Sequence, residues 1–296
     1  MTQSANRSLL RRYPGSALIR VTGADAKKWL QGLVTSDLNS LRDNAFWGLM
    51  LQRNGKVRCE LVGVTKDSVT WIAVVGGELR DVYSAMDSHI LMDDVELAIV
   101  SDVSLWAIHD LPSSPEFVLD ASLVVAAGSL RWFAEGDRVF IVDAARELAF
   151  VEALRARGLE PCNDADFERL RVSSGIPKWS VDYSDHDTPH HAALFGRAVA
   201  EKKGCYIGQE VVCKTEMIGR VAQRLTRLEL ESAAHIQAGT VVYERQTGES
   251  AGVVTSAATN SEGPSGWAIA RLKTAVIDAR ADLSVGENQA RIVDML

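Results

Sequence analysis

The sequence has no long apolar run and no excess of basic charge. Its longest stretch without Asp, Glu, Lys or Arg spans twelve residues, whereas a membrane-spanning helix needs about 18 or more apolar residues. The 39 acidic and 32 basic residues give a formal net charge of -7, which repels the phosphate backbone of a nucleic acid. The composition therefore predicts a soluble protein that binds neither membranes nor nucleic acids directly.

Cysteine is also scarce. The four cysteines stand at positions 59, 162, 205 and 213, and none of the gaps between them matches the spacing of a zinc knuckle. Such sparse cysteines are typical of a reduced, intracellular protein. The first acidic residue is Asp25, so the N-terminal stretch has the composition of a transit peptide, but Pro14-Gly15 would break an amphipathic helix there. We therefore expect a cytoplasmic protein.

Periodicity and turn signals predict both strands and helices in the first 220 residues. Asn54-Gly55 and Lys66-Asp67 mark tight turns, which favour antiparallel pairing of the strands on either side. Apolar residues at helical spacing predict helices that end near residues 32, 92, 158 and 174. Strands are predicted at 17–21, 46–51, 57–64, 69–75, 97–108 and 138–142.

The sequence changes character from about residue 221 onward. Short strands bounded by turns are typical of a small all-β barrel or sandwich. Helices and strands before this point do not alternate regularly, so the first part is predicted to be α+β and not a doubly wound parallel sheet. The sequence therefore predicts an α+β core at 1–220 and an all-β domain at 221–296.

The segment 202–212 carries the strongest chemical signal. Gly204 and Gly208 flank Cys205 just before a run with helical period. If a helix begins near Gly208, its positive end lies beside Cys205, and the two lysines that open the segment add positive charge. Both effects favour the thiolate, which is the reactive form of cysteine. The alternative is that the glycines only shape a turn and Cys205 packs as a small apolar residue.

The histidines give weaker signals. The stretch 182–191 mixes imidazoles and carboxylates, as a metal site would, but its Pro, Ser, Thr and Asp content is typical of a solvated loop. We therefore predict no metal site. His89, His109 and His235 are isolated in the sequence. No phosphate-binding glycine loop, dinucleotide fingerprint or serine nucleophile elbow stands at the required strand-to-helix position.

The octapeptide Lys203-Gly-Cys-Tyr-Ile-Gly-Gln-Glu210 resembles the signature of the YgfZ family. These proteins are folate-binding relatives of the glycine-cleavage T protein, an aminomethyltransferase. Further likenesses lie at 21–37, at Asn54-Gly-Lys56, at Gly175-Ile-Pro177 and at 252–256, so the resemblance spans nearly the whole chain. It implies a folate-binding core of two α+β subdomains around a central pocket, followed by a C-terminal all-β barrel.

The resemblance also implies a cofactor, partners and a site. Tetrahydrofolate is expected in the pocket, with Cys205 at its rim and Lys203 favouring the thiolate or meeting the folate carboxylates. The other residues assigned to folate binding are Glu60, Phe167, Arg171, Ser173, Tyr206, Gln209 and Glu210. Family members are linked to iron-sulfur cluster assembly or repair and, indirectly, to tRNA modification. Folate and iron-sulfur proteins or cluster-assembly factors are therefore the expected partners.

Within that site, four residues have more specific expected roles. Phe167 stacks on the folate in place of a family tryptophan but lacks its N–H donor. Tyr206 packs beside the thiol, while Gln209 and Glu210 order the start of the helix. Ordinary capping and surface solvation remain the alternative for Tyr206, Gln209 and Glu210.

Several positions depart from the pattern of the relatives. Aminomethyltransferases carry an aspartate in place of Cys205, an arginine in place of Gln209, and paired aspartates near Cys59-Glu60, where one acid remains here. Ser173 stands where a glutamate can grip the pterin, and this loss is expected to weaken folate binding by about tenfold to a hundredfold. Ser16 stands where the family has a second pocket tryptophan.

Two other functions remain open from the sequence. Glu60, as the surviving acid, suits a folate-dependent aminomethyl- or methyltransferase. Ser173 and Ser16 suit an interaction module that has lost folate binding. Support of iron-sulfur cluster assembly is the preferred prediction, and whether the protein is itself an enzyme is left open.

Overall fold

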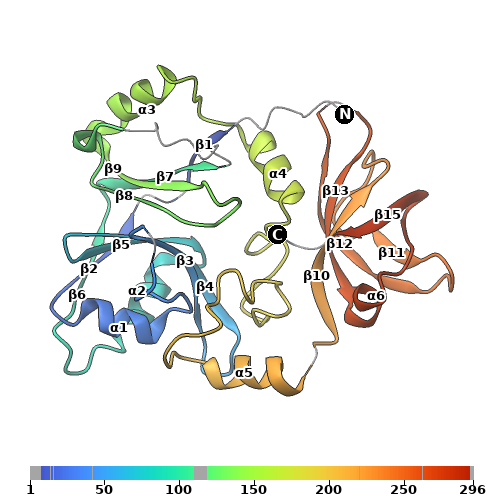
Figure 1. The fold of residues 1–296 in the computed structure, drawn as a ribbon, viewed down its shortest axis with the longest axis horizontal. Helices are drawn as coiled ribbons and strands as arrows, with labels where there is room; N and C mark the ends of the chain where they lie inside the picture. The colour runs from blue at the N-terminus through green and yellow to red at the C-terminus, as the bar shows by residue number, and fades with distance from the viewer. Residues whose placement is uncertain are drawn as a thin grey trace. The chain divides into compact units, whose positions relative to one another are not determined.

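The computed structural model describes residues 8–13, 15, 17–41, 43–109, 119–219, 221–261 and 263–293. The chain divides into two compact units. The first comprises Met1–Gln52, Arg58–Asn163 and Gly196–Ile207, and the second comprises Arg53–Val57, Asp164–Phe195 and Gly208–Leu296. Figure 1 shows their elements as a ribbon. Among the helices of the described residues, none is long and apolar enough to cross a membrane.

A five-stranded sheet in the first unit has the strand order β3-β4-β5-β2-β6. The strands are β2 (Leu18–Thr22), β3 (Ala45–Leu51), β4 (Val57–Lys66), β5 (Val69–Gly76) and β6 (Glu96–Val100). Helices α1 (Ala26–Leu33) and α2 (Leu79–Asp87) lie beside this sheet (Figure 1). Trp29 and Leu30 from α1 and Val82 and Met86 from α2 share one apolar core with the strands. This burial explains why apolar residues recur at helical spacing in both helices.

A four-stranded antiparallel sheet completes the first unit, with the order β1-β7-β9-β8. Its strands are β1 (Leu9–Arg12), β7 (Val103–His109), β8 (Ala126–Ser129) and β9 (Arg138–Asp143). The short helix η1 (Ala121–Leu123) precedes β8, and η2 (Ala144–Arg146) leads into α3 (Glu147–Arg155). Phe150 and Leu154 of α3 are fully buried in the core of this sheet.

A closed barrel of six strands dominates the second unit, with the order β10-β13-β12-β11-β14-β15. Its members are β10 (Gln223–Leu230), β11 (Val241–Glu244), β12 (Ser250–Thr259), β13 (Gly266–Lys273), β14 (Leu283–Val285) and β15 (Asn288–Val293). At Gly252 a Cβ atom would lie 2.0 Å from the carbonyl oxygen of Arg271. Only glycine therefore allows β12 and β13 to approach this closely.

Three helices belong to the same unit: α4 (Asp164–Ser173), α5 (Gln209–Ile218) and α6 (Thr274–Asp278). Helix α4 packs against β12 and β13 of the barrel. It ends as the sequence predicts, because Gly175 follows it with a φ of 66°, a left-handed conformation that glycine adopts without strain.

The predicted fold class is confirmed, including the C-terminal barrel. The apolar run 97–108 differs from the prediction, because a break at Ser101 and Asp102 divides it into β6 and β7. The predicted helix from residue 144 begins as the single turn η2 before α3. Strands β1 and β8 have four residues each, and such short segments carry too little periodicity to be predicted.

Candidate functional site

The octapeptide leads into a helix, as predicted. Gly208 has a φ of 80°, and α5 begins immediately after it. Cys205 lies in the loop before this glycine and is exposed. The exposure contradicts the alternative in which Cys205 packs as a small apolar residue, and it leaves the thiol open to solvent.

Lys203 is anchored at the C-terminal end of α1. Its Nζ lies 2.8, 2.5 and 2.8 Å from the carbonyl oxygens of Gln31, Val34 and Ser36, so each N–H of the ammonium group has an acceptor. Burial lowers the pKa of Lys203 to about 8, and the Asp37 carboxylate opposes this shift. All three N–H groups of the ammonium therefore bind backbone carbonyl groups. A contact of Lys203 with a thiolate or a folate carboxylate remains a prediction.

Three further hydrogen bonds, two of them between backbone groups, fasten residues 198–207 to residues 32–35. The bonds run from Thr35 Oγ1 to Ala198 O (2.6 Å), from Ala200 N to Thr35 O (3.0 Å) and from Ile207 N to Gly32 O (3.2 Å). Cys205 lies between two of the fastened residues, Lys203 and Ile207. The loop that carries the thiol is thus held on both sides of it.

Tyr206, Gln209 and Glu210 occupy different environments. Tyr206 is buried, and the Nζ of Lys203 lies 5.1 Å from its ring centroid, within the range of a cation–π interaction. Gln209 is half-buried and Glu210 is exposed. Both stand in the first turn of α5, where a carboxylate suits the positive end of the helix dipole.

Glu60 is a buried carboxylate on β4. Nε1 of Trp47 donates a hydrogen bond to its Oε1 at 2.8 Å, and only 5% of Glu60 is exposed. Burial raises the pKa of the neighbouring Cys59 thiol to about 12, so Cys59 is a protonated core residue. Within the Cys59-Glu60 pair, Glu60 is therefore the group that can accept a proton or a hydrogen bond.

A cavity of about 700 Å³ opens beside Trp47 in the first unit. Its wall includes Phe46 and the charged side chains of Arg131, Arg197 and Lys202. The guanidinium of Arg197 lies 5.8 Å from the centroid of the Trp47 ring. A cavity of this size suits a small organic molecule, and its lining offers both aromatic and charged contacts.

A buried chain of hydrogen-bonded polar side chains lies in the same unit, and no sequence motif predicts it. Nε2 of His109 lies 2.8 Å from the Tyr13 hydroxyl, and Nδ1 lies 2.9 Å from Oδ2 of Asp137. A carboxylate only accepts, so Nδ1 of His109 donates to Asp137, while Nε2 shares a hydrogen bond with the Tyr13 hydroxyl. Burial raises the pKa of Tyr13 well above 10.0, and the charges of Asp137 and Glu60 add to the shift. No local motif signals this chain, because its members are far apart in sequence.

Arg171 is fully engaged within the second unit. Its Nη1 donates to Asp182 at 2.7 Å and to the carbonyl of Ile176 at 2.7 Å. Nη2 donates to Ser256 at 2.8 Å and to Glu168 at 2.8 Å, and Nε also donates to Glu168 at 3.1 Å. All five N–H donors of the guanidinium thus have acceptors inside the protein. In this arrangement Arg171 has no spare N–H group with which to bind folate, the role predicted for it.

Phe167 and Ser173 lie on the same helix as Arg171. Phe167 is buried. The hydroxyl of Ser173 donates to the carbonyl of Leu170 at 3.0 Å, and the carbonyl of Ser173 accepts a hydrogen bond from Arg227. Ser173 therefore ends the helix with a local bond, and its hydroxyl is already engaged.

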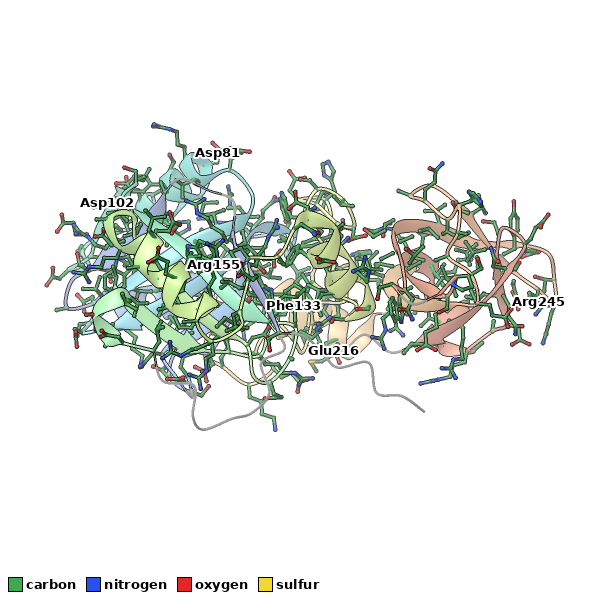
Figure 2. The ribbon with its side chains drawn as sticks, turned by 90° about the horizontal axis from the view of Figure 1, so that it is seen from above. Asp81, Asp102, Phe133, Arg155, Glu216 and Arg245 are labelled. Atoms are coloured by element: carbon green, nitrogen blue, oxygen red, sulfur yellow. The ribbon has the colours of Figure 1, made fainter. Side chains whose placement is uncertain are left out.

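The histidine-rich stretch is a loop, as predicted. Nε2 of His190 lies 3.2 Å from Oε2 of Glu216, which is labelled in Figure 2, and its ring stacks on Phe195. Burial lowers the pKa of His190, while Glu216 opposes the shift. Within the described ranges, no three His, Cys, Asp or Glu residues form a group that could hold a metal ion.

The predicted site residues divide between the two units. Those of the first unit are Glu60, Lys203, Cys205 and Tyr206, and those of the second are Phe167, Arg171, Ser173, Gln209 and Glu210. The structure brings Lys203 and Tyr206 together, and it places Phe167, Arg171 and Ser173 on α4. Ser16 lies outside the described residues.

No family model matches the chain, but individual relatives do. The chain is 25% identical to an iron-sulfur cluster assembly factor IBA57 homolog, mitochondrial, from Phaeosphaeria nodorum, and the match covers 76% of this chain and 56% of that protein. The match therefore spans little more than half of that relative. Identity to the aminomethyltransferase of Chromobacterium violaceum is 26%, covering 94% of this chain and 82% of the relative. Identity to the tRNA-modifying protein YgfZ of Colwellia psychrerythraea is 25%, covering 78% and 74%.

A solved structure has the same fold. The glycine cleavage system aminomethyltransferase T from Bartonella henselae matches with a TM-score of 0.77 and 18% identity, over 98% of this chain and 85% of that one. At this identity the likeness concerns the fold alone. Together with the relatives above, it confirms that the chain resembles the YgfZ family and the related aminomethyltransferases.

Proposed function

We propose that this protein supports iron-sulfur cluster assembly or repair, and through cluster-dependent enzymes indirectly supports tRNA modification. The names of the IBA57 and YgfZ relatives support this class of function. The observation that carries the proposal is the exposed thiol of Cys205, presented on a loop held by Lys203 and Ile207. In this proposal the thiol acts on iron-sulfur proteins or cluster-assembly factors. The net charge of -7 favours an indirect route to tRNA, and we place the activity in the cytoplasm.

Tetrahydrofolate is the proposed cofactor, and the chemistry of the available groups fits it. A pterin ring carries N–H and amino donors, for which a buried carboxylate such as Glu60 is a suitable acceptor. The cavity beside Trp47, in the same unit as Glu60, has the volume of a small-molecule site. When bound, tetrahydrofolate carries one-carbon units. Tyr206, which belongs to the same unit as Glu60, completes the proposed site.

Substitution of Cys205 tests the role of the thiol. In cells that lack the protein, Cys205→Ser should fail to restore the activity of cluster-dependent enzymes. Cys213→Ser is the matched control, because Cys213 is also an exposed cysteine and should be dispensable. Both variants should unfold at the wild-type temperature. Full restoration by Cys205→Ser would remove the thiol from the function.

Calorimetric titration with tetrahydrofolate tests the cofactor. We expect saturable heat at submillimolar ligand, and Glu60→Gln should weaken binding by about tenfold, because a hydrogen bond to a charged group contributes about 1.5–3 kcal/mol. Absence of heat with the folded wild-type protein would favour the interaction module that has lost folate binding.

A folate-dependent aminomethyltransferase is the second candidate. It is favoured by the buried Glu60 carboxylate and by the resemblance to the Chromobacterium violaceum aminomethyltransferase. A buried acid can manage protons on a folate nitrogen. Incubation with tetrahydrofolate and aminomethyl donors should then give steady formation of methylene-folate, which Glu60→Gln abolishes. No turnover with folate-saturated protein would exclude this candidate.

A further inference from the structure

Helix α1 lacks a cation of its own at its C-terminal end. The last carbonyl groups of any helix receive no hydrogen bond from within the helix, so a positive charge near them is favourable. The last turn of α1 contains no basic residue. Lys203 supplies that charge from 169 residues beyond Val34, so a distant segment caps this helix.

Lys203 acts on the end of α1 through directed hydrogen bonds and not only through its charge, and we call this arrangement a clamp. Its ammonium donates to three separate carbonyl oxygens, those of Gln31, Val34 and Ser36. Three hydrogens on a tetrahedral nitrogen can point at three acceptors at once, whereas the planar fork of arginine cannot adopt the same arrangement. The neighbouring Lys202 carries the same charge and is exposed.

We propose that Lys203 is a positioning residue for the Cys205 thiol: by clamping the end of α1 it fixes the loop on which Cys205 is presented. The backbone bond from Ile207 to Gly32 and the packing of the ammonium against the Tyr206 ring hold the same loop beyond the cysteine. The inference rests on the proposed function of Cys205. It assigns Lys203 a role that requires no contact with folate or substrate.

Two substitutions separate the clamp from the charge. Lys203→Met removes every N–H donor while keeping the length of the side chain. Lys203→Arg keeps the positive charge but not the three-way geometry, and as the milder change it carries the test if Lys203→Met fails to fold. Lys202→Met is the matched control, since it removes one positive charge from the adjacent position.

Hydrogen exchange of the full chain measures the position of the loop. Both Lys203 variants should speed exchange of the Ile207 and Ala200 amides by about tenfold or more, because at least one charged hydrogen bond is lost. Amides of the barrel strand β13 should exchange at the wild-type rate, which distinguishes local release from general destabilisation. Lys202→Met should leave all of these rates unchanged.

Restoration of cluster-dependent enzyme activity in cells gives the second measurement. Both Lys203 variants should lose at least about tenfold in activity at unchanged expression. Wild-type exchange rates in Lys203→Met would overturn the inference. Wild-type exchange and activity in Lys203→Arg would also overturn it, because the positive charge alone would then be enough to hold the loop. If Cys205→Ser proves active while the loop is released in the Lys203 variants, the proposed function fails and the clamp stands as a structural finding only.

Discussion

Arg171 and Asp182 form an ion pair that is almost completely removed from solvent. Nη1 lies 2.7 Å from Oδ2, and the two side chains are 3% and 0% exposed. Ser256 of β12 bonds to both partners, so the pair joins α4 to the barrel strand. A buried charge is costly unless it is paired and fully hydrogen-bonded. This network meets that condition, because all five N–H groups of Arg171 have acceptors and the Asp182 carboxylate accepts several hydrogen bonds.

Removal of one partner of this pair should be strongly destabilising. Arg171→Met leaves the Asp182 carboxylate buried without its cation, and we expect a loss of about 3–5 kcal/mol in the free energy of unfolding. Arg169→Met is the control on the same helix, because its ion pair with Asp166 is partly exposed and should contribute about 1 kcal/mol or less. Urea unfolding measures both. Equal effects of the two substitutions would contradict the structural role given to Arg171.

The Tyr13 hydroxyl should make stability depend on pH in the alkaline range. The pKa of Tyr13 is raised above 10.0 in the folded protein, first by burial and then by nearby carboxylates. The folded state therefore keeps a proton that the unfolded state loses, and this contribution is complete below pH 10 and lost as the pH rises above it.

Tyr13→Phe provides the comparison for that pH dependence. It should cost about 1–3 kcal/mol at neutral pH, because Nε2 of the buried His109 loses its hydrogen-bond partner. It should also flatten the fall in stability as the pH rises above 10. Chemical unfolding at several pH values measures both effects, and an identical alkaline slope in the variant would count against the assignment.

The cysteines should differ sharply in their reactivity. A thiol with a pKa of about 12, as burial gives Cys59, is about 0.01% thiolate at pH 8, and the thiolate is the reactive form. Maleimide labelling of the folded protein should therefore modify the exposed Cys205 and Cys213 within minutes and spare Cys59 until urea is added. Peptide mapping identifies the modified residues. Rapid labelling of Cys59 in the folded state would show that its burial is wrong.

Substitution by alanine should destabilise the protein at Gly252 but not at Gly204. A Cβ at Gly252 would lie 2.0 Å from the Arg271 carbonyl oxygen, so Gly252→Ala must force β12 and β13 apart and should cost about 1–3 kcal/mol. A Cβ at Gly204 meets no described heavy atom within 4 Å. Gly204→Ala should therefore fold with wild-type stability, and thermal unfolding of the pair checks this contrast.

The ends of helices can be predicted from the sequence where a single neighbouring residue determines them. Gly208 before a run of helical period predicted the start of α5, and Gly175 predicted the end of α4, because a left-handed glycine acts on its immediate neighbours. Prediction from the sequence failed where partners are distant. The acceptors of Lys203 stand 167 to 172 residues earlier, and His109 meets partners 96 and 28 residues away. Only a three-dimensional structure shows that such residues meet.

The first unit is assembled from separated stretches of chain, and the last of them, Gly196–Ile207, follows residues that belong to the second unit. During synthesis, Lys203 can therefore bind the carbonyl groups at the end of α1 only after this later stretch has been made. Contacts between residues so far apart in sequence slow folding, because long loops must close first. Cys205 thus takes its place only after residues 203–207 have been synthesised, so a chain that ends before Lys203 would lack both the thiol and the clamp that holds its loop.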